Sequence, residues 1–444
     1  MKRLQRCFLL IFFISTAAYA QGGFKFFGDE NRTKIKFRLI NNLIIIPVEV
    51  NGVELSFVLD TGVNKPILFN LDASDSLKIN NVEEIFLKGL GEGNPIKAYK
   101  SRGNRFKIKQ DIYNNNQMLY VILDENINFS QRLGFPVHGI IGYDLFKDFI
   151  VEINYARKRL WLYNPETYSY KSCRKCEVFP LDFALNKPYI DARVGLEDKD
   201  SIPVKLLIDS GSSDALWLFE DMKKDIMLPT EYFEDFLGRG LSGSIYGKRS
   251  RVAQLQIGSF ILEGAKVAFP DSTSVKHIKS IKERNGSLGA EVLKRFNVLF
   301  DYGNRTITLK KNKNFRAPFK YNMSGIELQH NGIRFVKELE SNIQGLVKDD
   351  EDPNGGVKIV LDEHYKISLH PAFEIAEIRE DSPAALAGLQ QGDVIISING
   401  KSAHRYSLQE VAEMLNEAEG KKIRLLVDRN SAMLTFFFML RRVL

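Results

Sequence analysis

The chain contains two copies of one unusual pattern, in which an apolar strand ends in Asp, a small hydroxyl residue and Gly. The first copy, "SFVLDTG", ends at Gly62, and the second, "KLLIDSG", ends at Gly211. A carboxylate at the end of a buried strand is costly unless it is paired or used. One such motif alone would be read as an ordinary turn. Its repetition favours two related folding units.

The sequences around the two motifs repeat as well. Residues 47–69 resemble residues 189–219, and residues 138–163 resemble residues 286–310. The later pair shares a Gly-x-x-Gly motif, a short helical segment, a Phe and two strands. Matching landmarks in the two copies lie 147 to 149 residues apart. An internal repeat of this length indicates two similar domains.

Each half also carries a Gly-rich segment after its Asp, at residues 89–103 and 238–251. Both halves are rich in β-branched and aromatic residues, with turn signals every ~8–12 residues, as in barrels and sandwiches. The sequence therefore predicts a mainly β protein. We expect two similar β-barrel lobes, an N-terminal one over residues 21–170 and a C-terminal one over residues 171–316.

The last part of the chain, residues 317–444, has a different pattern. Ser382 and Pro383 predict the start of one helix, and the capping box of Ser407 and Glu410 predicts the start of a second. Strand-like runs surround both helices, so a small α+β domain is expected. The acidic stretch "KDDEDPNGG" makes residues 333–362 look like an inserted polar loop.

Residues 1–20 have a basic start, a short apolar run and an A-x-A ending, as a secretory signal peptide does. The apolar run is too short for a membrane span, so none is expected in the mature chain, which we expect to be exported and either periplasmic or secreted. Removal of the signal's three basic residues lowers the net charge from +7 to +4. This charge does not call for a nucleic-acid partner, and the basic run at 276–285 is expected to be a solvated face.

Cys173 and Cys176 form a C-x-x-C motif with no second Cys pair or His pair near it in the sequence. A zinc site normally needs four ligands, and a thioredoxin-like motif would need a βαβ setting. In an exported protein we expect either a local disulfide or two free thiols.

The repeated Asp has a chemical use if the two lobes face each other. Two carboxylates at hydrogen-bond distance cannot both ionise, so the pair of Asp60 and Asp209 would hold one proton near working pH. Such a pair can deprotonate a water molecule while it protonates a carbonyl oxygen. That is amide hydrolysis without a metal or a cofactor, and neither is expected here. The sequence has no H-E-x-x-H and no G-x-S-x-G motif, and His138 is expected to be structural.

The neighbours of the two Asp residues fit this role. Gly62 and Gly211 let the two turns approach closely and donate N–H groups to the carboxylates, while Thr61 and Ser210 offer hydroxyls that can bond across the lobe junction. The glycine pairs at 139/142 and 286/289 are expected beneath the Asp loops. The Gly-rich segments suit mobile flaps over a cleft. The flap candidates are Gly91, Gly93, Gly243 and Tyr246.

The motifs "VLDTG" and "LIDSG", together with "GIIG" and "GSLG", resemble those of the retropepsin-like and pepsin-like aspartic peptidases, over residues ~35–315. The resemblance implies Asp60 and Asp209 as the catalytic dyad. Ser212, after the second motif, fits the family pattern. Val63, after the first, departs from it, because the family usually has Ala, Ser or Thr there. Val63 removes a possible hydroxyl bond to Asp60 and puts the tuning of its pKa in question.

The segment "SPAALAGLQQGDVIISING" resembles a PDZ domain of the bacterial exported-protease type, over residues ~320–444. The resemblance implies a groove that binds a peptide as an added strand and captures its terminal carboxylate. Gly325 and Ile326 are candidates for the carboxylate loop. Val411 and Leu415 either face the groove or belong to the core.

Two hypotheses of function follow. The first is an exported aspartic endopeptidase that cleaves extended polypeptides and uses its PDZ domain for a peptide or protein C-terminus. The alternative is a catalytically weak or inactive peptide-binding scaffold, which Val63 motivates. A monomer is expected, because both half-sites lie in one chain.

Overall fold

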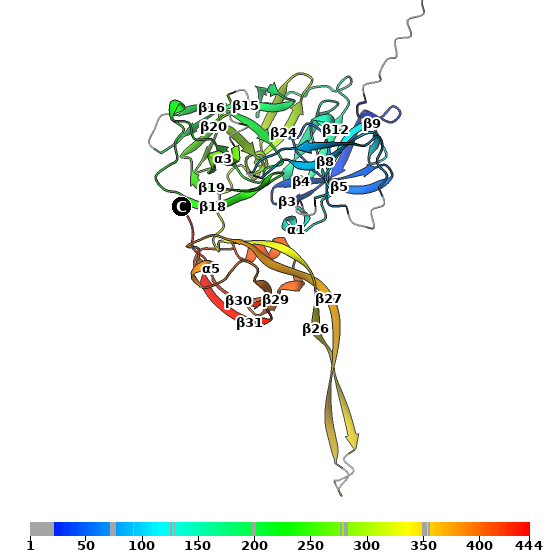
Figure 1. Ribbon diagram of the computed structural model, residues 1–444, viewed down its shortest axis with the longest axis vertical. Helices are drawn as coiled ribbons and strands as arrows, with labels where there is room; N and C mark the ends of the chain where they lie inside the picture. The colour runs from blue at the N-terminus through cyan, green and yellow to red at the C-terminus, as the bar shows by residue number, and fades with distance from the viewer. Residues whose placement is uncertain are drawn as a thin grey trace, which may run out of the picture.

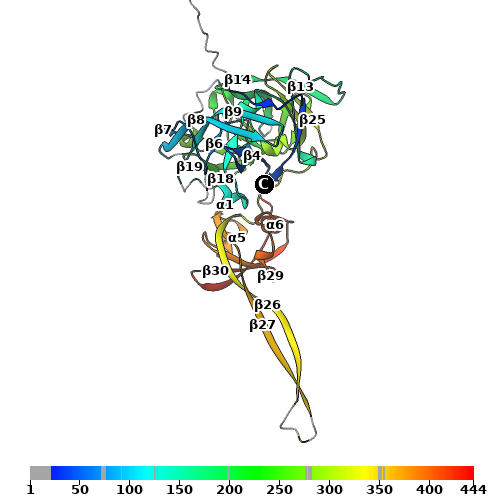
Figure 2. The ribbon, with the colours of Figure 1, turned by 90° about the vertical axis from the view of Figure 1, so that its right-hand side faces the viewer.

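The computed structural model describes residues 22–71, 77–91, 93–124, 127, 129–197, 201–275, 278, 283–348, 353 and 356–444. The expected signal peptide, residues 1–20, lies outside these. The protein is mainly β, as predicted, and its described strands form four sheets. Figures 1 and 2 show three of them in one body, with the fourth sheet and a long two-stranded ribbon below it. Among the helices that the structure describes, none is both long and apolar enough to cross a membrane.

The first sheet, here called the N-terminal sheet, has nine strands and carries the first Asp motif. Its strands are β1 (Lys25–Phe26), β3 (Arg38–Ile40), β4 (Leu43–Val50), β5 (Val53–Leu59), β6 (Ile67–Leu68), β7 (Glu83–Leu87), β8 (Ile96–Ile108), β9 (Ile112–Val121) and β10 (Gly139–Ile141). The inner strand β5 is buried on alternate residues and then continuously toward its end. This burial places Asp60 at the end of a core strand.

The second, here called the C-terminal sheet, has ten strands. They are β14 (Asp182–Ala184), β15 (Lys187–Gly195), β16 (Ile202–Asp209), β17 (Leu216–Leu218), β18 (Phe233–Gly240), β19 (Gly243–Arg251), β20 (Gln254–Ile257), β21 (Phe260–Glu263), β22 (Lys266–Pro270) and β23 (Gly286–Gly289). In it β23 runs parallel to β16 and antiparallel to β17, just as β10 runs parallel to β5 and antiparallel to β6 in the N-terminal sheet. The sequence repeat is thus also a repeat of strand pairing.

A third sheet, here called the shared sheet, takes strands from both halves of the repeat. Its strands are β2 (Arg32–Lys36), β11 (Ile150–Asn154), β12 (Arg159–Tyr163), β13 (Cys176–Pro180), β24 (Phe296–Asp301) and β25 (Thr306–Lys311). The halves meet where β11 pairs with β24, with Val151 opposite Phe300. Both residues are fully buried in one hydrophobic core that runs through both halves. The sequence repeat predicted two separate barrels, so a sheet that both halves share was not expected.

Short helical segments connect these strands. They are α1 (Phe129–Leu133), α2 (Tyr143–Phe146), α3 (Ser272–Val275), α4 (Ala290–Leu293) and the 3₁₀ turns η1 (Tyr155–Arg157) and η2 (Met222–Lys224). In the connection between the halves, Cys173 and Cys176 form a disulfide. Of the two states expected for this motif, the structure has the disulfide.

The fourth sheet, here called the PDZ sheet, follows with its own hydrophobic core. Its elements are β26 (Ile326–Lys348), β27 (Val357–Ile378), α5 (Pro383–Leu386), β28 (Val394–Ile398), β29 (Lys401–Ser402), η3 (Ala403–Arg405), α6 (Leu408–Met414), β30 (Lys422–Arg429) and β31 (Ala432–Met439). Both helix starts are as predicted: Ser382 caps α5, and Ser407 with Glu410 forms the capping box of α6. Strand β26 is an edge of the sheet and pairs only with β27 in the strand order of the described residues.

The prediction of a polar loop over residues 333–362 is wrong. Strands β26 and β27 continue through most of this segment as an antiparallel ribbon that pairs up to Lys348 and Val357. The ribbon extends away from the body (Figures 1 and 2). Apolar residues alternate with charged or polar ones at 333–335 and 365–370, and Phe335 pairs with Leu369. This alternation has a strand period, but the acidic stretch at 349–352, which lies outside the described residues, favoured a loop.

Candidate active site

The structure brings Asp60 and Asp209 together at the ends of β5 and β16. The two turns approach so closely that a Cβ atom on Gly211 would lie 2.3 Å from Cγ of Asp60. A Cβ atom on Gly62 would lie 3.4 Å from Oδ1 of Asp209. Each glycine also donates its N–H to the Asp of its own turn, Gly62 at 2.6 Å and Gly211 at 3.1 Å. Only glycine fits at position 211.

The two hydroxyl residues form a reciprocal set of four hydrogen bonds between the turns. Thr61 donates its Oγ1–H to the carbonyl of Ile208 at 2.7 Å and its N–H to Ser210 Oγ at 3.0 Å. Ser210 donates its Oγ–H to the carbonyl of Leu59 at 2.8 Å and its N–H to Thr61 Oγ1 at 3.0 Å. Both hydroxyl residues are buried. These bonds fix the two Asp-bearing turns relative to each other.

The later glycine motifs support the turns from below, as expected. A Cβ atom on Gly142 would lie 2.0 Å from the carbonyl oxygen of Asp60, and one on Gly289 would lie 3.1 Å from that of Ser212. Gly139 and Gly286 are packed as tightly against β6 and β17. Any larger residue at these positions would push the Asp turns out of place.

The electrostatics of the pair follow from burial and proximity. Removal from water, followed by the charge of Asp209, raises the pKa of Asp60 from 3.8 to about 7. The N–H of Gly62 and the ammonium of Lys187 oppose this rise. Burial also raises the pKa of Asp209, against the charges of Arg284 and Lys187. Because both pKa values are raised and the two acids are coupled, the pair shares one proton between them.

Sequence reasoning missed both of these cations. Arg284 is buried, donating Nε–H to the carbonyl of Gly286 at 3.0 Å and its Nη2 group to Ser287 Oγ at 2.5 Å. It belongs to the basic run expected to be a solvated face, so for Arg284 that expectation is wrong. The available signal was its position two residues before the second Gly-x-x-Gly motif, which the fold places beside Asp209.

The presence of Val63 does not remove the backbone hydrogen bonds to the carboxylates of Asp60 and Asp209. The carboxylate of Asp60 accepts from the amide of Gly62, and that of Asp209 accepts from the amide of Gly211. Each acid thus has a backbone donor in the glycine of its own turn. The N–H of Val63 donates to the carbonyl of Asp60 at 3.3 Å, as that of Ser212 does for Asp209. The missing hydroxyl at position 63 removes neither of these arrangements.

The two expected flap segments contact each other. Gly93 donates its N–H to the carbonyl of Ser242 at 2.7 Å, and Ser242 donates its own to Leu90 at 2.9 Å. Gly91 and Gly243 both have positive φ, which suits the tight turns at this contact. Tyr246 lies on β19, about half exposed, with its ring against Phe236.

A cavity of about 230 Å³ contains Asp60 and Gly211. Strand β18 lines it with Phe236, Leu237, Gly238 and Arg239, of which the last two belong to the second flap segment. The flap candidate Tyr246 is not among its lining residues. From the PDZ sheet, Glu327 and Leu328 of β26 also line it. The edge strand of the PDZ domain is therefore part of the wall of the site.

A second cavity, of about 570 Å³, lies between β26 and α6. The two cavities share six lining residues: Asn41, Arg132, Ser213, Arg249, Glu327 and Leu328. Direct contacts hold the PDZ sheet at this place. Arg132 forms an ion pair with Glu377 at 3.0 Å, and Gln409 donates its side-chain amide to the carbonyl of Leu133 at 2.5 Å. The groove beside α6 and the site with Asp60 thus adjoin each other.

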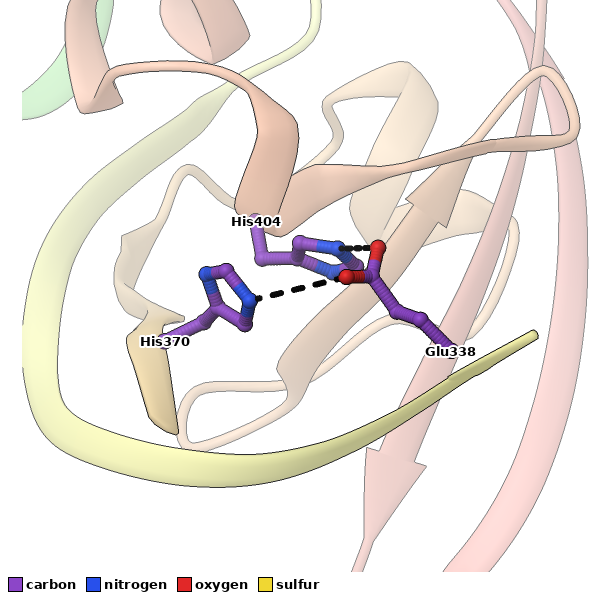
Figure 3. Close-up of side chains that lie close together, drawn as sticks. All are labelled: Glu338, His370 and His404. Carbon is purple, nitrogen blue, oxygen red and sulfur yellow. Dashed lines mark hydrogen bonds and ion pairs between the residues drawn. The ribbon is translucent and has the colours of Figure 1, made fainter. Parts of the chain in front are cut away.

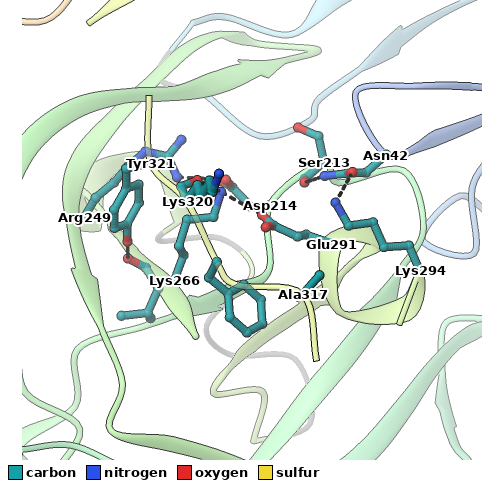
Figure 4. Close-up of polar contacts among 12 residues, drawn as sticks. Asn42, Ser213, Asp214, Arg249, Lys266, Glu291, Lys294, Ala317, Lys320 and Tyr321 are labelled. Atoms are coloured by element: carbon teal, nitrogen blue, oxygen red, sulfur yellow. Dashed lines mark hydrogen bonds and ion pairs between the residues drawn. The ribbon is translucent and has the colours of Figure 1, made fainter. Parts of the chain in front are cut away.

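The polar wall of the second cavity connects the Asp209 turn to its surroundings (Figure 4). Asp214 accepts from Arg249 Nη1 at 2.7 Å, and Arg249 also binds Asp235 of β18 at 2.7 Å. Asn42, from the first half, donates to the carbonyl of Ser213 at 2.7 Å and accepts from Lys294 at 2.8 Å. Strand β18 and the N-terminal half are in this way both tied to the second Asp turn.

The PDZ candidates fall into two groups. Gly325 has φ of 83°, and its N–H donates to Asn322 Oδ1, while the N–H of Ile326 donates to Ser324 Oγ. A carboxylate in this loop would have to replace these side-chain acceptors. Val411 and Leu415 are fully buried in the PDZ core, so their interpretation as core residues holds. The face of α6 toward the cavity carries Leu408, Gln409, Ala412, Glu413 and Asn416 instead.

The cross-turn bonds can be tested by replacing Thr61 with Val, which keeps the shape but leaves a buried carbonyl and a buried N–H without a partner. We expect Thr61→Val to lower the free energy of unfolding by about 2–4 kcal/mol in a denaturant titration. The control is Thr33→Val, at a buried Thr whose hydroxyl makes one side-chain bond, to Asp111. Equal losses in the two variants would contradict a special role for the cross-turn bonds.

Comparison with protein families agrees with this geometry. Residues 46–145 match the family model of aspartyl proteases, and residues 374–429 match that of PDZ domains. A comparison with curated proteins gives no match. The first match contains Asp60 and Gly142, and the second covers the end of β27 and the elements from α5 to β30. The chain therefore contains an aspartyl protease domain followed by a C-terminal PDZ domain.

Proposed function

We propose that the protein is an aspartic endopeptidase that hydrolyses peptide bonds in extended polypeptides. The observation that carries this proposal is the pair of Asp60 and Asp209, held face to face by Thr61 and Ser210 with one shared proton. In this state the ionised acid takes a proton from a water molecule between the carboxylates. The protonated acid gives its proton to the carbonyl oxygen of the substrate. The water oxygen bonds to the carbonyl carbon and forms a gem-diol. As the C–N bond breaks, the acid that took the proton of water gives it to the leaving amine, and the other acid takes a proton from a gem-diol hydroxyl, so the pair again holds one proton.

The cavity around the dyad supports a polypeptide substrate. Strand β18 and the edge strand β26 both border it, and an extended chain can pair with strand edges through its own backbone. The adjoining groove beside α6 supports recognition of a peptide or protein C-terminus by the PDZ domain. Both half-sites lie in one chain, so we propose that a monomer is active. The pattern of residues 1–20 supports export to the periplasm or the exterior.

Replacing either acid by its amide should abolish cleavage. We expect Asp60→Asn and Asp209→Asn each to lower kcat/KM on a denatured protein substrate by at least ~10³-fold. A pair with one amide cannot both take a proton from water and pass a proton to the carbonyl. The control Asp191→Asn changes a carboxylate of the same half whose side chain is 77% exposed, and should leave the rate unchanged. Full activity in both dyad variants would refute the mechanism. Peptide binding without turnover in the unmodified chain would instead favour the scaffold.

The shared proton predicts a loss of activity at alkaline pH. As pH rises through the pKa of Asp60, about 7, the pair loses its proton and the general acid is gone. We expect kcat/KM to fall across this range. Because the charge of Lys187 lowers the pKa of both acids, Lys187→Met should move the falling limb to higher pH. If the pH at which kcat/KM falls stays the same or becomes lower in Lys187→Met, the assigned role of Lys187 is contradicted.

The PDZ groove can be tested with peptides that differ only at their end. We expect the Asp60→Asn variant, which cannot cleave them, to bind peptides with a free C-terminal carboxylate at least ~10-fold more tightly than the same peptides with a C-terminal amide, a difference of about 1.4 kcal/mol. The measurement is a fluorescence titration with labelled peptides. Equal affinities would mean that the groove does not recognise C-termini, and would leave the peptidase proposal untouched.

A further inference from the structure

Three potential metal ligands meet at the base of the β26–β27 ribbon, away from the dyad (Figure 3). Glu338 lies on β26, His370 on β27 and His404 in the η3 turn of the PDZ body. Nε2 of His404 lies 3.0 Å from Oε1 of Glu338, and Nε2 of His370 lies 3.9 Å from Oε2 of the same carboxylate. Both imidazoles thus point one nitrogen at one carboxylate.

The chemistry of this set is that of a transition-metal site. Two imidazole nitrogens and one carboxylate oxygen are ligands that Zn²⁺ prefers, and three protein ligands leave a fourth position for water. The three ligand atoms lie within 4.8 Å of one another. Adjustments on the order of 1 Å would bring them to the ~3.3 Å edges of a tetrahedron around Zn²⁺. The ligand side chains of His370 and Glu338, about 30% exposed, have room for such adjustments.

The groups that now contact the ligands can give way. Nη2 of Arg405 lies 3.3 Å from Oε1 of Glu338, but the Arg405 side chain is 68% exposed and such an ion pair is weak. Ser368 Oγ lies 2.8 Å from Nε2 of His370 and can turn away. The two imidazole rings, with centroids 4.5 Å apart, lie close together beside one carboxylate. A cation between them would neutralise that carboxylate and bind both nitrogens at once.

We propose that Glu338, His370 and His404 form a binding site for a divalent transition metal of the Zn²⁺ class. The ligands come from three separate segments, both strands of the ribbon and the η3 turn. The bound ion therefore fastens the base of the ribbon to the PDZ body. Since the site is apart from the cavity that contains Asp60, the proposal is independent of the peptidase activity.

The test uses the untagged full chain after treatment with a chelator. A calorimetric titration with Zn²⁺ should show one equivalent bound. A titration with Co²⁺ in place of Zn²⁺ should give the visible absorption bands of a tetrahedral site. His370→Gln should lower the affinity for Zn²⁺ by more than the ~10–100-fold typical of losing an outer-shell partner. The matched control is His330→Gln, on the neighbouring strand β26 and outside the cluster, which should bind as the unmodified chain does.

Two further measurements make the test specific. Arg405→Gln removes the cation that competes for Glu338, so it should bind Zn²⁺ more tightly than the unmodified chain. Hydrogen exchange of the ribbon base, on both strands beside Glu338 and His370, should slow when Zn²⁺ is added. Absence of binding, or equal binding by His370→Gln and His330→Gln, would overturn the proposal. Because His370 is partly exposed, its replacement tests the site without disturbing the PDZ core.

Discussion

The arrangement of this protein depends on the reciprocal hydrogen bonds between Thr61 and Ser210. They are buried, they cross between the two halves of the repeat, and each hydroxyl both donates and accepts. Two ionised carboxylates in one site repel each other, and these bonds hold the turns together against that repulsion. The cost of burying and crowding the acids appears as a raised pKa. The glycines beneath and beside the turns then have one purpose, which is to leave room for this contact.

Much of this centre could be predicted from the sequence because its constraints are local and repeated. The Asp–hydroxyl–Gly triplet determines its own turn, and the spacing of Gly139 and Gly142 from Asp60 recurs in the second half. The helix starts at Ser382 and Ser407 could be predicted for the same reason, since a cap acts within three or four residues. The dyad roles of Asp60 and Asp209 remain predictions that the proposed variants test.

Features made by contacts between distant segments could not be predicted in this way. The shared sheet pairs strands from the two halves of the repeat, and the sequence of a strand does not identify the strand with which it pairs. Arg284 looked like a surface residue because charge patterns do not show which cation the fold buries. In α6, an apolar stripe such as that of Val411 and Leu415 is compatible with a groove or with a core. The ribbon was missed because the acidic stretch at 349–352 in the sequence outweighed the short alternation at 333–335 and 365–370.

The path of β26 has a mechanical consequence. Within its first three residues the strand borders the cavity of the dyad, and it then continues for 23 residues in all, a length of roughly 75 Å at the usual rise of a strand. It is thus one continuous backbone from the wall of the cavity that contains Asp60 to the far part of the ribbon, with its partner β27 beside it. A load applied to the ribbon acts through a long lever arm on the place where Glu327 and Leu328 line that cavity. How far such a load displaces Glu327 and Leu328 depends on the stiffness of β26 at its base.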